Sequence, residues 1–145
     1  MKVQYLIHLG FDEVRVAFPL HDIDRVIRTV AVTPVAGAPA CLLGIVDIAG
    51  ETVPVYDMRR LLGLHGRSMQ PSDRMVLTRE PCRFAFTADE VLGILDEEPA
   101  APPAAFSFDA AGVRGVATTG DRMTLVHDLK RFMALERAIS LQRHA

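Results

Sequence analysis

The stretch that decides the fold is GIVDIAGETVPVYDMRRLL, residues 44–62. Apolar and polar residues alternate on both sides of an alanine–glycine pair, which predicts two short strands, residues 44–48 and 52–56, joined by a tight turn. Because Pro54 cannot donate a hydrogen bond to a neighbouring strand, we expect a free edge or a bulge beside it. Asp57 follows the second strand and precedes an apolar and basic segment. It is therefore either a catalytic carboxylate in a loop or the residue that begins a helix.

The same pattern recurs later in the chain. The segment GVATTGDRMTLVHDLKRFM, residues 115–133, aligns with residues 44–62 without a gap, and Asp128 aligns with Asp57. A second pair of segments, RVAFPLHDIDRVI and RFAFTADEVLGIL, also aligns, and the two pairs keep the same order along the chain. Two matches in one order predict a duplicated half-domain.

An aspartate that recurs at the same joint between a strand and a helix is more simply a cap than a catalyst. Its carboxylate accepts hydrogen bonds from the free N–H groups of the first helical turn. We therefore expect Asp57 and Asp128 each to begin a short helix. Apolar residues recur at helical spacing over residues 128–142, which predicts a C-terminal amphipathic helix.

The spacing of the predicted strands sets the fold class. Several short strands with turn signals between them favour barrels or a sandwich, and the lack of long helices between strands argues against a Rossmann-type parallel sheet. Together with the repeat, this predicts an all-β fold of two small barrels, each closed by a short helix. We expect residues 1–145 to form a single domain of two pseudo-repeated halves, divided in the polar loop near residues 64–74.

Composition excludes several classes of function. The chain has 145 residues, half of them hydrophobic, with 16 basic and 18 acidic residues and a net charge of −2. The charges are scattered and form no basic stripe, so a nucleic-acid partner is not expected. No apolar run reaches the roughly 20 residues that a membrane-spanning helix needs. The N-terminal segment alternates and reads as a first strand rather than a signal peptide. We expect a cytoplasmic protein that does not insert into the membrane.

A search for catalytic or metal-binding motifs finds little. The five histidines are dispersed, and neither CxxC nor HExxH occurs, so we expect no metal site and no cofactor. His127 stands beside Asp128, but no serine or cysteine nearby could be activated. The segment DEVLGILDEE is rich in carboxylates, which glycosidases use in pairs, although a solvated turn beside an apolar strand explains it better. A binding module is the favoured class.

Three segments carry a more specific signal: LLGIVDIAGETVPVYDMRRLLGL, DEVLGILDEEP and GVATTGDRMTLVHDLKRFM. The first combines a turn glycine, a strand with a proline, and an aspartate before an apolar helix. Together they resemble the CheW-like coupling domain of bacterial chemotaxis, over residues 4–133. The resemblance implies two intertwined, SH3-like, five-stranded β-barrels around a shared core, in agreement with the duplication.

The resemblance also implies a non-catalytic adaptor in a two-component signal transduction system. Members of this family bridge the cytoplasmic tips of methyl-accepting chemoreceptors to the regulatory domain of a CheA-type histidine kinase, through protein–protein contacts. This implies a cytoplasmic location at membrane-bound receptor arrays. Transferred by position, the receptor-binding groove would involve Ile23, Arg25, Val26, Gly44, Ala49 and Gly50.

Two of these positions depart from the family pattern. Members usually carry arginine where this chain has Ala49, and often glutamate where it has Arg25. An arginine fork cannot be replaced by alanine, so the departures imply an altered partner. The strands at the turn are expected to leave apolar residues uncovered, which adds Ile48 to the partner surface. We expect a partner that packs against apolar residues and offers an acidic group to Arg25. In the alternative interpretation, Arg25 is a solvated charge and Ile48 belongs to the core.

Two further functions stay open at this stage. The chain could be a small-barrel module that binds a protein or peptide in a divergent signalling pathway outside chemotaxis. It could also be a hydrolase that uses a pair of carboxylates. Binding to a kinase and a receptor separates the first from the adaptor, and a turnover assay tests the second.

Overall fold

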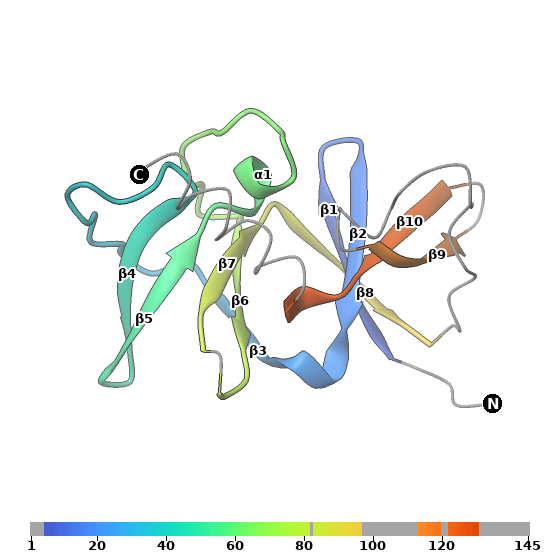
Figure 1. Cartoon of the computed structure of the whole chain (residues 1–145), viewed down its shortest axis with the longest axis horizontal. Helices are drawn as coiled ribbons and strands as arrows, with labels where there is room; N and C mark the ends of the chain where they lie inside the picture. The colour runs from blue at the N-terminus through green and yellow to red at the C-terminus, as the bar shows by residue number, and fades with distance from the viewer. Residues whose placement is uncertain (1–4, 82, 97–112, 120–121, 131–145) are drawn as a thin grey trace. The chain divides into compact units, whose positions relative to one another are not determined.

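The computed structural model describes residues 5–81, 83–96, 113–119 and 122–130 (Figure 1). These residues form ten strands in two five-stranded sheets, with one short α-helix and one 3-10 turn. The prediction of an all-β fold is confirmed. Of the predicted C-terminal helix, residues 129 and 130 are helical, and residues 131–142 lie outside the described residues. No helix in the described part of the chain is long and apolar enough to cross a membrane.

The chain divides into two compact units. Unit 1 combines Met1–Asp22 with Val91–Ala145, and unit 2 is Ile23–Glu90. The loop at residues 64–74 lies inside unit 2, so a division of the chain at this loop does not separate the two units. The reason is that the chain leaves unit 1 after its first hairpin and returns to it only with a later strand. The loop separates the two sequence repeats, but each unit contains strands from both.

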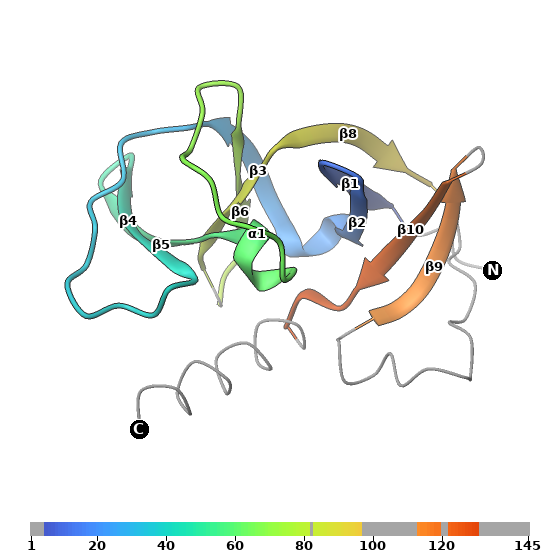
Figure 2. The same cartoon turned by 90° about the horizontal axis from the view of Figure 1, so that it is seen from above.

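Unit 1 is built on a sheet with the strand order β8-β1-β2-β10-β9. The first hairpin pairs antiparallel strands, and β10 runs parallel to β2. Figure 2 shows the β9–β10 hairpin of this unit from above. The strands are β1 (Leu6–Phe11), β2 (Val14–Pro19), β8 (Glu90–Leu95), β9 (Val113–Thr119) and β10 (Arg122–His127). Its core includes Leu6, Ala17, Ala117 and Val126.

Unit 2 has a sheet with the order β3-β6-β7-β5-β4. A 3-10 turn η1 (Leu20–Asp22) precedes it. Its elements are β3 (Ile23–Arg28), β4 (Leu42–Ile48), β5 (Glu51–Tyr56), α1 (Met58–Leu61), β6 (Arg74–Thr78) and β7 (Ala85–Ala88). The core comprises Val46, Ile48, Val53, Val55, Met75, Leu77 and Ala85. The predicted hairpin over residues 44–56 is therefore present as β4 and β5.

The two sheets repeat one topology. Replacing each strand of unit 1 by its counterpart in the sequence repeat converts the order β8-β1-β2-β10-β9 into β3-β6-β7-β5-β4. The agreement extends to residues in the parallel pairs. Val126 pairs with Ala17 in unit 1, and the aligned residues Val55 and Ala85 pair in unit 2. The sequence repeat thus corresponds to a structural duplication in which the repeats exchange strands.

Pro54 lies where the sheet of unit 2 tolerates it. It pairs with Ile45 of β4 on one side. On the other side, the ladder with β7 contains only Val55 and Tyr56. The absent N–H of Pro54 therefore interrupts no pairing with β7, which fulfils the expectation of a locally free edge.

Candidate partner-binding surface

The residues predicted for partner binding all lie in unit 2, but their side chains differ in exposure. On β3, Arg25 and Val26 are exposed, with 51% of the Arg25 side chain accessible to solvent. Ile23, at the start of the same strand, is buried at 4%. The β3–β6 register shifts between Ile23 and Arg25, so simple alternation does not hold across this part of the strand, and β3 presents only part of the predicted set to solvent.

Ile48 is a core residue, and its expected outward orientation is wrong. It is only 9% exposed and packs in the cluster around Val53 and Val55. The polar residues beside it, Asp47 and Glu51, are exposed. This follows from the alternation along β4, which turns Asp47 to solvent and Ile48 inward. The expected uncovered apolar residues are therefore not found at this turn.

Gly44 allows two backbone segments to approach each other closely. Its φ is 151°, and a Cβ placed on it would lie 2.1 Å from the Thr33 carbonyl oxygen. Thr33 and Ile45 exchange two backbone hydrogen bonds of 2.8 and 2.9 Å, which fasten the segment after β3 to β4. The glycine permits this close approach of two backbones.

Ala49 and Gly50 form the tight turn between β4 and β5. Both have positive φ, 52° and 87°, as hairpin turns of the primed type require. The side chain of Asp47 accepts a hydrogen bond of 2.8 Å from the Gly50 N–H. Both turn residues are exposed, so the turn offers backbone and small side chains to a partner.

Arg83 joins this turn to β3. Its Nε donates to Glu51 at 3.0 Å, and its Nη1 donates to Asp24 at 2.7 Å. The same Nη1 also donates to the Thr78 carbonyl at 3.0 Å. In Figure 1 the β4–β5 turn and the β6–β7 loop lie at the same end of unit 2. Sequence reasoning missed Arg83, because its acidic partners lie 32 and 59 residues away in the chain.

Arginines surround Asp24 in this cluster. The hydrogen bond from Arg83 lowers the pKa of Asp24, and the charges of Arg83, Arg25 and Arg79 act in the same direction, against a smaller effect of burial. The hydrogen bond to Asp24 likewise raises the pKa of Arg83. Arg25 Nε lies 3.9 Å from the Asp24 carboxylate. The surface formed by Asp24, Arg25, Glu51, Arg79 and Arg83 thus carries three cations and two anions.

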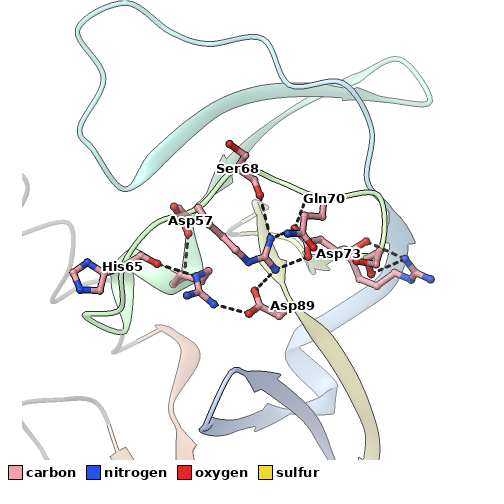
Figure 3. Close-up of polar contacts among 10 residues, drawn as sticks. Asp57, His65, Ser68, Gln70, Asp73 and Asp89 are labelled. Carbon is pink, nitrogen blue, oxygen red and sulfur yellow. Dashed lines mark hydrogen bonds and ion pairs between the residues drawn. The ribbon is translucent and has the colours of Figure 1, made fainter.

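A second polar network fixes the loop after α1 (Figure 3). Arg59 donates to the His65 carbonyl at 2.9 Å and to Asp89 at 2.6 Å. Arg67 contacts the other oxygen of Asp89 at 2.9 Å and binds both oxygens of Asp73, at 3.0 and 2.7 Å. Asp73 also accepts from the Gln70 N–H. The polar loop is therefore held to the helix and to the end of β7, and its carboxylates are engaged in ion pairs.

Asp57 caps α1, as predicted. Its side chain accepts from the Arg59 N–H at 3.1 Å, and its backbone adopts the extended conformation of an N-cap. Asp128 occupies the corresponding place, directly after β10 and before helical residues 129 and 130. Neither aspartate lies within a strand, so the duplicated joint is present in both units.

The two described histidines of unit 1, His8 and His127, are buried and form no accessible catalytic site. In unit 1, Thr124 Oγ1 lies 2.9 Å from His8 Nε2, but both side chains are buried, so a substrate could not reach them. Burial and the charge of Arg15 lower the pKa of His8, which favours its neutral form. His127 packs against the Phe18 ring. Among the described residues, no group of three potential metal ligands comes together.

Comparison with known proteins agrees with this fold. The model of the CheW-like domain family matches residues 6–137. This chain belongs to the CheW-like family. A chemotaxis protein CheW from Thermotoga maritima is 27% identical over 95 residues, which cover 66% of this chain and 63% of that protein. The chain thus spans less than two thirds of the length of this curated relative.

A solved structure has the same CheW-like fold. The crystal structure of the scaffolding protein TtCheW from Thermoanaerobacter tengcongensis superposes with a TM-score of 0.77 and 21% sequence identity. The match covers 87% of this chain and 89% of that one. At this identity the likeness establishes the fold, and it supports the interpretation of the two sheets as a pair of SH3-like barrels.

Proposed function

We propose that this CheW-like protein is a non-catalytic adaptor that couples chemoreceptors to a CheA-type histidine kinase in a chemotaxis or related two-component pathway. Family membership supports this function, because a match over residues 6–137 covers most of the chain. The expected partners are the cytoplasmic tip of a methyl-accepting chemoreceptor and the regulatory domain of the kinase. The protein would act in the cytoplasm, at receptor arrays.

The observation that carries the proposal on the structural side is the exposed surface of unit 2 around β3. It exposes an apolar side chain, Val26, and a cation, Arg25, and Arg83 links this strand to the residue after the Ala49–Gly50 turn through Asp24 and Glu51. A partner segment that carries an aspartate or glutamate next to an apolar side chain fits this combination. Ile23, Gly44 and Ile48 would support the surface from within, because their positions are buried.

Isothermal titration of the full chain against two purified partners tests the proposal. The partners are the cytoplasmic domain of a chemoreceptor and the regulatory domain of a CheA-type kinase, both encoded in the source genome. We expect saturable binding to each. Absence of binding to both would refute the adaptor function and favour a module of another pathway.

A matched pair of charge reversals tests the surface. Arg25 and Arg122 are equally exposed, at 51% of the side chain, but Arg122 lies in unit 1. Arg25→Glu should weaken binding of the receptor domain, and the loss should shrink at high salt, because exposed charges are screened. Arg122→Glu should leave the affinity unchanged. Equal effects of the two variants would place the contact elsewhere.

A further inference from the structure

Arg83 is placed to organise the partner-binding surface without contacting the partner itself. Only 16% of its side chain is exposed. Its Nε and both N–H groups of Nη1 have acceptors, on Glu51, Asp24 and the Thr78 carbonyl. Three of the five N–H donors of the guanidinium are thus engaged within the protein, and most of the side chain is buried.

The neighbours of Asp24 show what Arg83 achieves. Arg25 lies beside Asp24, but its Nε stands 3.9 Å from the carboxylate, whereas Arg83 Nη1 approaches to 2.7 Å. The carboxylate is therefore held on Arg83. If Arg83 released it, Asp24 would be free to pair with the cation of Arg25 or Arg79. A carboxylate of the same chain would then compete with a carboxylate of a partner.

Because the two units are duplicated, the surroundings of Arg83 in unit 2 can be compared with those of the aligned arginine in unit 1. Arg15 aligns with Arg83, but Leu92 and Arg122 stand where unit 2 has Asp24 and Glu51. The Nε of Arg15 is buried without a hydrogen-bond partner among the described residues. Unit 1 thus keeps the arginine and lacks both carboxylates. The arrangement around Arg83 belongs to unit 2 alone, the unit that carries the predicted partner residues.

We infer that Arg83 is a positioning residue that occupies Asp24 and Glu51, so that Arg25 and Arg79 are left to bind a carboxylate of a protein partner. The occupant of this surface is a partner segment with an aspartate or glutamate that meets these two cations. Charge complementarity supports this choice, because Arg83 and Arg25 both lie within 4 Å of the Asp24 carboxylate, at 2.7 and 3.9 Å, and the charge of Arg79 also acts on it. The inference rests on the proposed adaptor function for the identity of the partner.

A suppressor experiment separates positioning from simple stabilisation. The chemoreceptor cytoplasmic domain is titrated into the full chain at low ionic strength. Arg83→Gln should weaken binding about threefold to fivefold, the upper part of the range expected for the loss of one exposed ion pair in the complex. Adding Asp24→Asn to Arg83→Gln should restore the affinity to about twofold of wild type, because the competing carboxylate is gone. Asp24→Asn alone should not weaken binding.

Two controls accompany this titration. Arg15→Gln removes the aligned arginine of unit 1 and should leave the affinity unchanged. Thermal unfolding of each variant shows whether it is folded. The inference is overturned if Arg83→Gln binds like wild type, or if the double variant is as weak as Arg83→Gln. In the second case Arg83 would serve stability or touch the partner directly.

A measurement without a partner keeps this inference distinct from the proposed function. The NMR resonance of the Arg25 Nε–H group is followed while Asp24 is titrated with acid. In Arg83→Gln the resonance should shift with the Asp24 titration, because the two side chains then pair. In wild type the shift should be much smaller. Equal shifts in both proteins would refute the role of Arg83, even if no chemoreceptor or kinase domain binds the wild-type chain.

Discussion

Gly44, a predicted partner-binding residue, also has a structural role in the backbone. Its φ of 151° and the 2.1 Å separation between a built Cβ and the Thr33 oxygen leave no room for a side chain. Gly44→Ala should therefore lower the free energy of unfolding by at least about 1–3 kcal/mol through backbone strain alone.

Gly63 provides the control for Gly44, because it also has positive φ, 78°, but nothing lies within 4 Å of a built Cβ. Gly63→Ala should cost about 1–2 kcal/mol, the penalty of the left-handed conformation without a clash. Urea unfolding measures both. If the two variants lost equal stability, the contact with Thr33 would be unimportant.

Ile48 and Val26 form a second contrast between single residues. Ile48 is 9% exposed in the core cluster, whereas Val26 is 37% exposed on β3. Ile48→Asp should abolish cooperative thermal unfolding, because it buries an unpaired charge. Val26→Asp should keep a melting curve close to that of wild type and weaken receptor binding. A stable Ile48→Asp variant would restore the original expectation that this side chain faces outward.

At the scale of elements, the loop between α1 and β6 is held by ion pairs whose strength depends on pH. Burial raises the pKa of Asp73, but hydrogen bonds from Arg67 and from the Gln70 N–H, with the charges of Arg67 and Arg59, lower it overall. A carboxyl group whose pKa is lower in the folded state stabilises the fold above its unfolded pKa, about 3.9. This contribution is lost as the pH falls from that value toward the folded pKa.

The comparison of wild type with Asp73→Asn tests this dependence. We expect the variant to be less stable near neutral pH, and we expect the difference in unfolding free energy to narrow below about pH 4. Asp96→Asn changes an exposed aspartate after β8 and should show no such narrowing. A difference that stays constant down to pH 2 would mean that the Asp73 ion pair does not supply the stability.

The elements themselves could be predicted well from local signals. Alternation and turn residues located the hairpins, and the repeated aspartates located the helix starts. The alternation also contained the orientation of Ile48, since Asp47 before it is polar and Val46 before that is apolar. Arg83 could not be found in this way, because nothing local links it to Asp24 and Glu51. Likewise, a sequence repeat does not reveal that its two copies exchange strands, so the loop at residues 64–74 separates the repeats and not the two compact units.

At the scale of the whole molecule, strand exchange determines which parts of the chain can fold alone. Residues 23–90 contain all five strands of the unit 2 sheet, and we expect this fragment to unfold cooperatively. A cut within the loop at residues 64–74 divides both sheets. Fragments 1–68 and 69–145 should therefore each lack a cooperative transition and regain it when mixed. Circular dichroism during heating distinguishes these outcomes, and cooperative unfolding of either fragment alone would contradict them.

The parallel pairing of β2 with β10 has a consequence for protein synthesis. The ribosome releases the β1–β2 hairpin long before β10, but Val16 and Ala17 pair with Leu125 and Val126 of that later strand. One edge of β2 must therefore stay unpaired while the whole of unit 2 is translated. Unpaired strand edges attract other chains. The nascent protein is thus exposed to aggregation at the β1–β2 hairpin, and chaperones that bind emerging chains would protect it there.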